Sequence, residues 1–210
     1  MTPTAVNRIY KKLSGSFPNP KSELFYRNNF ELLIAVMLSA QSTDKTVNSV
    51  TRKLFDNYPT PQAFLECGEP RLKEIIRTIG LAPTKAKNII RTCELLIDKH
   101  SGSMPDSRED LENLPGVGRK TANVTLNEGF GVPTIAVDTH VFRVANRTGL
   151  APGKSVLETE KLLLKVTPDK WKINAHRYLI LHGRYVCKAK NFRCDGCAIV
   201  KECQYPDKNM

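Results

Sequence analysis

The stretch LPGVGRKTANV, residues 114–124, decides most of what the sequence predicts about the fold. It places Gly116 and Gly118 in a tight turn and continues directly into a segment with helical spacing. The preceding SREDLENL, from Ser107, has the pattern of a capped helix. A glycine turn before a helix N-terminus presents backbone N–H groups, here those of Val117 and Gly118, and a partial positive charge to an anion. The stretch therefore predicts two helices joined by a phosphate-binding turn.

The phosphate of a free nucleotide does not fit this turn. A P-loop requires G-x-x-x-x-G-K-[ST] after a strand, whereas Lys120 follows Arg119 and the segment before the turn is helical. A turn between two packed helices also uses glycines without binding anything, so the turn alone does not identify a ligand.

The charge of the chain favours a polyanionic partner. Among 210 residues there are 32 Lys or Arg and 21 Asp or Glu, a net charge of +11, and the isoelectric point is near 9.5. Residues 161–210 hold eleven Lys or Arg and four Asp or Glu, a net of +7. A folded protein this basic is expected to bind nucleic acid, although solubility alone is an alternative.

The N-terminal segment MTPTAVNRIYKKL has no apolar core of signal-peptide length, and the longest apolar run is Leu32–Leu38. We therefore expect a cytoplasmic protein, in a bacterium one associated with the nucleoid, with no contact to a membrane. Structural disulfides are not expected in that compartment.

The apolar pattern predicts an all-α fold. No segment of strand length alternates with period two, and the long segments show helical spacing. FELLIAVML, residues 30–38, is apolar on all sides and is expected to be a buried central helix. Gly80 is expected to stop a helix. Helix starts are expected at Thr43 or Asp44, at Thr60–Pro61, and at Ser155, where Glu158 completes a capping box.

Four cysteines in the last 24 residues predict a metal site: Cys187, Cys194, Cys197 and Cys203, spaced C-x6-C-x2-C-x5-C. Zinc usually uses two tight pairs, and a [4Fe–4S] cluster spreads its ligands over a larger object. With one tight pair and two wider arcs, the spacing leaves both open. Cys67 and Cys93 are expected to be core thiols, and His140 and His182 to be structural.

The first arc between the cysteines, KAKNFR from Lys188 to Arg193, combines Lys188, Lys190 and Arg193 with an aromatic residue. Held by a metal centre, it would form a rigid loop that contacts phosphate. Alternatively, its cations offset the negative charge of the thiolates.

As a set, these features resemble the endonuclease III branch of the helix-hairpin-helix DNA glycosylase superfamily, over essentially the whole chain. The similarity rests on the hairpin, the cysteine spacing and four further segments: ELLIAVMLSAQSTD (31–44), IGLAPTKAKNI (79–89), PTIAVDTHVFRVANR (133–147) and LILHGRYVC (179–187).

The resemblance implies a six-helix domain spanning residues 22–132, and a second domain made of residues 1–21 and 133–210. It implies a [4Fe–4S] cluster bound by the four cysteines, and double-stranded DNA in a cleft between the domains. A monomer is expected.

The resemblance also implies roles for single residues. Lys120 is similar to the family's nucleophile and Asp138 to its essential carboxylate. Gln41 and Leu81 match residues that enter the duplex where the damaged nucleotide leaves, and the hairpin residues Gly116, Val117, Gly118 and Arg119 contact DNA. Taken alone, Gln41 and Lys120 would be surface residues, Leu81 a packing contact and Asp138 an N-cap.

The resulting expectation is a bifunctional DNA glycosylase and AP lyase that removes oxidised pyrimidines. A monofunctional, adenine-type glycosylase is one alternative, which Lys120 argues against. A non-catalytic helix-hairpin-helix DNA-binding module is another, and it leaves Lys120 and Asp138 unexplained together.

Overall fold

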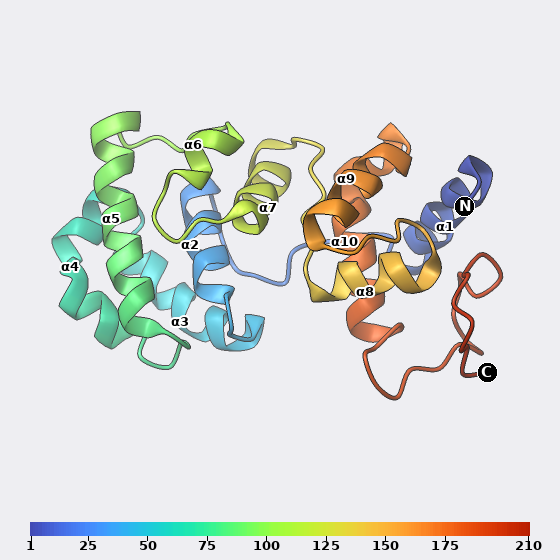
Figure 1. The fold of residues 1–210 in the computed structure, drawn as a ribbon. Coiled ribbons are helices and arrows are strands. Elements are labelled where there is room, and N and C mark those ends of the chain that lie inside the picture. Colours follow the sequence, from blue (N-terminus) through green and yellow to red (C-terminus); the bar gives the residue numbers. More distant parts are fainter. The chain divides into compact units, whose positions relative to one another are not determined.

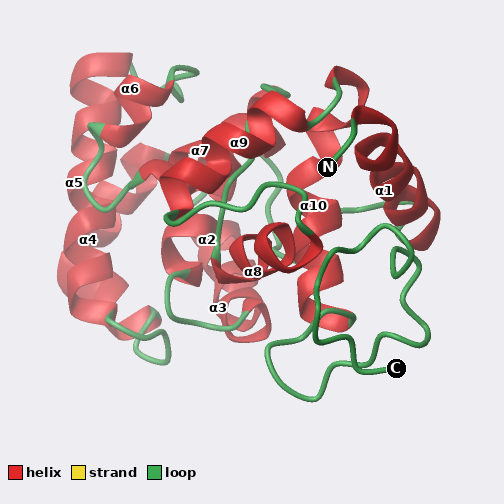
Figure 2. Cartoon of the chain, turned by 45° about the vertical axis from the view of Figure 1, so that its right-hand side comes forward, coloured by secondary structure: helices red, strands yellow, loops and turns green.

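The computed structural model describes residues 1–210 as ten helices without a strand, which confirms the all-α prediction (Figure 2). The helices are α1 (Pro3–Ser16), α2 (Asn29–Ser39), α3 (Asp44–Asn57), α4 (Pro61–Ile75), α5 (Ala82–His100), α6 (Arg108–Glu112), α7 (Arg119–Phe130), α8 (Thr139–Thr148), α9 (Val156–Val166) and α10 (Asp169–Tyr185).

The chain forms two compact units. One consists of Ser22–Gly131 and the other of Met1–Lys21 together with Val132–Met210. The second unit therefore takes its first helix from the N-terminus and the rest from the C-terminal part of the chain.

In the unit Ser22–Gly131, α2 is the buried central helix that the apolar run predicted. Every residue from Phe30 to Leu38 is buried. Helices α3, α5 and α7 pack against α2, and α4 packs against α5 (Figure 1). Helix α2 therefore has no solvent-exposed face, as expected of a helix that is apolar on all sides.

Side-chain caps start the helices as the sequence predicted. The hydroxyl groups of Thr43, Thr60 and Ser155 each accept a hydrogen bond from the backbone N–H three residues later. Each cap satisfies one of the N–H groups that the first turn of a helix leaves without a partner.

The expectation that Gly80 stops a helix is wrong. Helix α4 ends at Ile75, and Gly80 lies in the turn before α5. A Cβ atom at Gly80 would lie 3.0 Å from the carbonyl oxygen of Gln41. Gly80 is thus required by the close approach of two chain segments, a long-range contact that local sequence does not reveal.

In the other unit, α1 and α8 pack against α10 (Figure 1). The core draws its apolar side chains from α1, α8 and α10 and from the segment before α8, and includes Ile9, Tyr10, Val141 and Leu179. Residues after Tyr185 form no further helix, and they contain all four cysteines of the expected metal site.

Candidate active site

The hairpin between α6 and α7 has the predicted glycine turn. Gly116 has a φ of 77°, and a Cβ atom there would lie 2.8 Å from Nδ2 of Asn88 on α5, so the turn requires glycine for two reasons. The side chain of Thr92, one turn further along α5, donates a hydrogen bond to the Pro115 carbonyl at 3.1 Å. Helix α5 thus contacts the turn through Asn88 and Thr92 and stabilises it.

One detail of the predicted hairpin is wrong. The N–H of Val117 already donates to the Leu114 carbonyl at 3.0 Å, because this bond closes the turn, and the Val117 side chain is buried. Val117 therefore does not offer its N–H to a ligand. The donors that remain belong to the N-terminus of α7, beginning with Gly118.

The N-terminus of α7 lacks a side-chain cap. Gly118 is its N-cap residue, has no atom within 4 Å of where a Cβ would lie, and leaves the helix end open. Arg119 and Lys120 are the first two helical residues, and Lys120 is exposed. This end combines unpaired N–H groups with two cations, an arrangement suited to an anionic ligand.

Asp138 caps α8 in a way that uses one of its two oxygens. Its Oδ1 accepts hydrogen bonds from the N–H groups of His140 at 2.9 Å and Val141 at 2.8 Å. The segment before it is buried, and Nδ1 of His176 lies 2.7 Å from the Ala136 carbonyl, which fixes the approach to the cap. Oδ2 takes no part in the cap and can serve another purpose.

Gln41 and Leu81 lie in two adjacent turns with unusual backbone geometry. Their φ angles are 55° and 62°, in the left-handed region, which costs a residue with a side chain about 1–2 kcal/mol. The Leu81 side chain is 54% exposed. A strained backbone and an exposed apolar side chain are more often found together at functional positions than in packing contacts, so Leu81 is a candidate for one.

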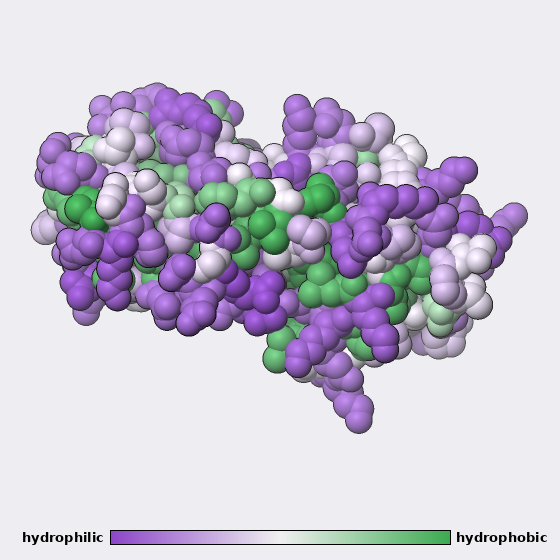
Figure 3. Space-filling view, turned by 90° about the horizontal axis from the view of Figure 1, so that it is seen from above, coloured by the Kyte–Doolittle hydropathy of each residue, from purple (hydrophilic) through white to green (hydrophobic).

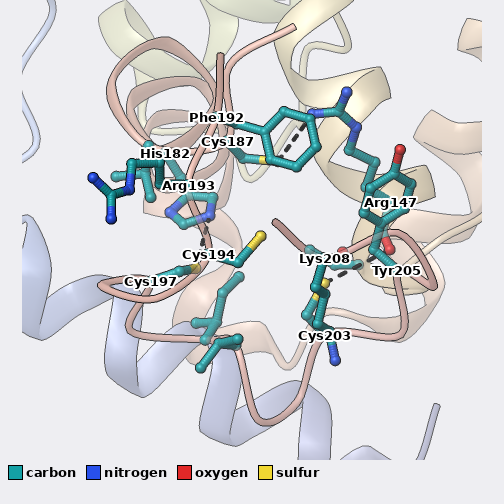
Figure 4. A pocket seen from close by; sticks show the side chains of 14 residues that line it. Arg147, His182, Cys187, Phe192, Arg193, Cys194, Cys197, Cys203, Tyr205 and Lys208 are labelled. Carbon is teal, nitrogen blue, oxygen red and sulfur yellow. Dashed lines mark hydrogen bonds between the residues drawn. The ribbon is translucent and has the colours of Figure 1, made fainter. Parts of the chain in front are cut away.

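The four C-terminal cysteines line one pocket (Figure 4). All four are free thiols and half-buried. No three metal-binding side chains lie close enough together to hold a single ion. Burial raises the pKa of the Cys197 and Cys203 thiols, so a cationic group is needed to keep them as thiolates.

Two arginines of α8 hold the loop between the first two cysteines. Nε of Arg143 donates to the Cys187 carbonyl at 3.0 Å, and Nη1 of Arg147 donates to the Lys188 carbonyl at 2.7 Å. The Arg147 guanidinium also lies over the rings of Phe192 and Tyr205, with its carbon 4.3 and 5.1 Å from their centroids (Figure 4). Neither arginine was predicted from the sequence as a functional residue. Their i, i+4 spacing, which places them on one face of a helix, could have indicated that they act together.

The cations of that loop point to solvent. Lys188, Lys190 and Arg193 are all exposed, and Arg193 forms an ion pair with Asp195 at 2.8 Å. An exposed pair of this kind contributes little to stability, so Arg193 can exchange its partner for a phosphate.

The remaining cysteines and the two histidines of the sequence prediction differ in burial and in their contacts. Cys93 is a core thiol whose pKa burial raises to about 12, but Cys67 is half-buried rather than in the core. Nδ1 of His140 lies 3.2 Å from Nη2 of Arg143. His182 is buried with its Nε2 3.8 Å from the Cys197 sulfur, and burial lowers its pKa to about 4.

Residues 34–169 match the family model of the HhH-GPD superfamily base excision DNA repair proteins. The chain is 55% identical over 208 residues to endonuclease III of Haemophilus influenzae, covering 99% of each chain. It is 54% identical over 200 residues to endonuclease III of Escherichia coli K12, covering 95% of each. A solved structure described as a trapped endonuclease III–DNA covalent intermediate has a TM-score of 0.91 at 46% identity, covering 97% of this chain and 96% of that one.

The chain therefore belongs to the HhH-GPD superfamily of base excision DNA repair proteins, and within it to the endonuclease III family. It is a DNA-binding enzyme with both DNA glycosylase and AP lyase activity. The endonuclease III family carries a [4Fe–4S] cluster. None of the helices is long and apolar enough to span a membrane.

The surface agrees with a nucleic-acid partner. Hydrophilic side chains cover much of the face drawn in Figure 3, with hydrophobic ones gathered along its middle. The chain as a whole has a net charge of +11, which favours binding to the phosphates of a nucleic acid.

Proposed function

We propose that this enzyme removes oxidised pyrimidines from duplex DNA, with Lys120 as the nucleophile and Asp138 as the assisting carboxylate. The hairpin at Gly116 and the open N-terminus of α7 would bind a backbone phosphate of the damaged strand. Lys120, two residues after the Gly118 cap, would then meet the deoxyribose next to that phosphate. The trapped covalent complex described for the similar endonuclease III structure is consistent with a covalent mechanism.

An enzyme that acts on a base must first flip it out of the stack, at a cost of a few kcal/mol. The exposed Leu81 and the adjacent Gln41 turn are suited to fill the space that the nucleotide leaves. We therefore propose that both side chains enter the duplex at the position that the flipped nucleotide leaves.

In the chemical step, the neutral amine of Lys120 attacks C1′ and expels the damaged base. Asp138 stabilises the positive charge that builds on the sugar or accepts a proton. The sugar ring then opens as the C1′–O4′ bond breaks and O4′ takes up a proton, which gives a Schiff base between Lys120 and C1′. The Schiff base acidifies the C2′ proton, and loss of that proton expels the 3′ phosphate, so β-elimination cuts the strand on the 3′ side without a metal.

This proposal depends most on the Asp138 carboxylate, in which one oxygen caps α8 and the other does not. Oδ1 alone makes both cap hydrogen bonds, so the other oxygen is available to the sugar while α8 stays capped. The cap therefore leaves one carboxylate oxygen, and with it part of the negative charge, free to face the sugar.

We also propose that Cys187, Cys194, Cys197 and Cys203 bind the [4Fe–4S] cluster. The fit rests on one observation: all four thiols line the same pocket, whose lining also includes Arg147 and Arg193. Four cysteine thiolates are the usual ligand set of a [4Fe–4S] cluster, and the family carries this cluster. The bound cluster would supply a rigid, charge-balanced crosslink of the C-terminal segment, which fixes the loop carrying Lys188 and Lys190.

Comparison of Asp138→Asn with Asp138→Ser tests the catalytic assignment. Both substitutions keep a capping side chain, so the fold and the melting temperature should change little. Single-turnover release of an oxidised thymine should slow by several orders of magnitude in both variants. Wild-type rates in either variant would show that Asp138 is a cap and nothing more.

The sequence resemblance further leads us to expect a monomer that acts on chromosomal DNA in the cytoplasm. Sedimentation of the free enzyme and of its complex with one duplex gives the stoichiometry, and two copies per lesion would contradict the expectation.

A further inference from the structure

The ammonium group of Lys85 is buried within the unit Ser22–Gly131, in the first turn of α5. The residue is 7% exposed, and its Nζ donates hydrogen bonds to the carbonyl oxygens of Leu38, at 2.7 Å, and of Ala40. No carboxylate pairs with it. Burial without a counter-ion is costly for a cation, and only its hydrogen bonds to the two carbonyls offset that cost.

The two acceptors belong to the end of α2. Leu38 lies in its last turn and Ala40 is its C-cap residue. The carbonyls at a helix C-terminus are unsatisfied and carry partial negative charge, which makes them suitable partners for an ammonium. The residue that follows directly is Gln41, so the side chain of Lys85 fixes the point from which the Gln41 turn departs.

The second turn leads directly into α5. Leu81 is the N-cap residue of this helix, and its carbonyl accepts the first hydrogen bond of the helix, from the N–H of Lys85 at 3.0 Å. The two turns are also joined directly, because the N–H of Gly80 donates to Oγ of Ser42 at 3.2 Å. One residue therefore contacts the carbonyl just before Gln41 through its side chain and the carbonyl of Leu81 through its backbone.

We propose that Lys85 is a positioning residue that locks the Gln41 and Leu81 turns together, so that both side chains enter the duplex as one rigid wedge. This inference rests on the proposed role of Gln41 and Leu81. It adds that the side-chain hydrogen bonds of Lys85 to the Leu38 and Ala40 carbonyls hold the two turns in place. Loss of the lock should impair opening of the duplex and leave the chemistry on an opened nucleotide intact.

The test compares Lys85→Met with Lys87→Met, which removes an exposed cation from the same helix. Single-turnover base release is measured on two duplexes, one with the oxidised thymine paired and one with it unpaired in a bulge. Lys85→Met should lose about tenfold or more on the paired lesion and less than about threefold on the bulged one, since the bulge removes most of the opening cost. Lys87→Met should reduce both equally or neither.

An equal loss on both duplexes, or no loss in a folded Lys85→Met variant, would overturn the inference. If Lys85→Met does not fold, Lys85→Arg keeps the charge and alters the reach, and it should show the same selective loss. Gln41→Ala and Leu81→Ala distinguish failure of the proposed function from failure of this inference. If base release from the paired lesion is unchanged in both variants, the proposed role of Gln41 and Leu81 in duplex opening is wrong. If they impair it and Lys85→Met does not, the inference about Lys85 alone fails.

Discussion

Two lysines occupy comparable positions in one unit and have opposite surroundings. Lys85 lies in the first turn of α5 and Lys120 in the first turn of α7, where the helix dipole disfavours a cation. Lys85 is buried and donates to two backbone carbonyls. Lys120 is exposed and forms no hydrogen bond or ion pair within the protein. Contacts within the protein thus account for the position of Lys85, whereas the proposed function accounts for that of Lys120 by a ligand.

The two lysines should differ most in what they contribute to the free energy of unfolding. Lys85→Met should lower the free energy of unfolding by about 1–3 kcal/mol, because the buried Leu38 carbonyl and the partly buried Ala40 carbonyl lose their donor. Lys120→Gln should leave it unchanged or slightly higher, because the substitution removes a cation from a helix N-terminus. Urea unfolding of the two variants gives both values. Equal losses would mean that Lys120 also has a structural role.

A second prediction concerns the wedge that Lys85 is proposed to lock. Leu81→Gly relieves the left-handed strain of a side chain that is 54% exposed, so stability should rise by about 0.5–1 kcal/mol while base release from a paired lesion falls. Leu157→Gly is the matched control, since Leu157 is 44% exposed but lies within helix α9. That variant should be destabilised. A less stable Leu81→Gly enzyme would show that the turn is not strained.

The smallest effect is expected from cations that lie outside the reactive site. Replacing Lys190 and Arg193 by alanine should weaken binding to damaged and undamaged duplex alike, and should flatten the dependence of affinity on salt by about one unit of slope per lost phosphate contact. Fluorescence titration at several salt concentrations measures this. An unchanged slope would mean that the loop does not contact the backbone, and a selective loss on damaged DNA would assign it a role closer to that of Lys120.

The features that the sequence predicted correctly are those encoded locally. The apolar run of α2 and the caps at Thr43, Thr60 and Ser155 depend on residues within one or two turns of each other, so periodicity and capping rules suffice. The hairpin was found for the same reason.

The features that the sequence analysis missed depend on contacts between distant segments. Gly80 is a glycine because Gln41 approaches it, and Lys85 reaches carbonyls more than forty positions earlier in the chain. The spacing of the four cysteines left zinc and iron–sulfur open, because spacing along the chain does not fix the distances between thiols. One local signal does mark Lys85: in LAPTKAKNI it lies near the start of a helix, where the helix dipole disfavours a cation.

The central claim is that Lys120 is left without partners in the protein because it bonds to the substrate. Borohydride reduction of the enzyme on a duplex with one abasic site tests it directly, since reduction converts a Schiff base into a permanent crosslink. Wild-type enzyme and Lys85→Met should both give the crosslinked product, and Lys120→Gln should bind the same duplex and give none. A crosslink of normal yield with Lys120→Gln would show that another amine is the nucleophile and would contradict the account.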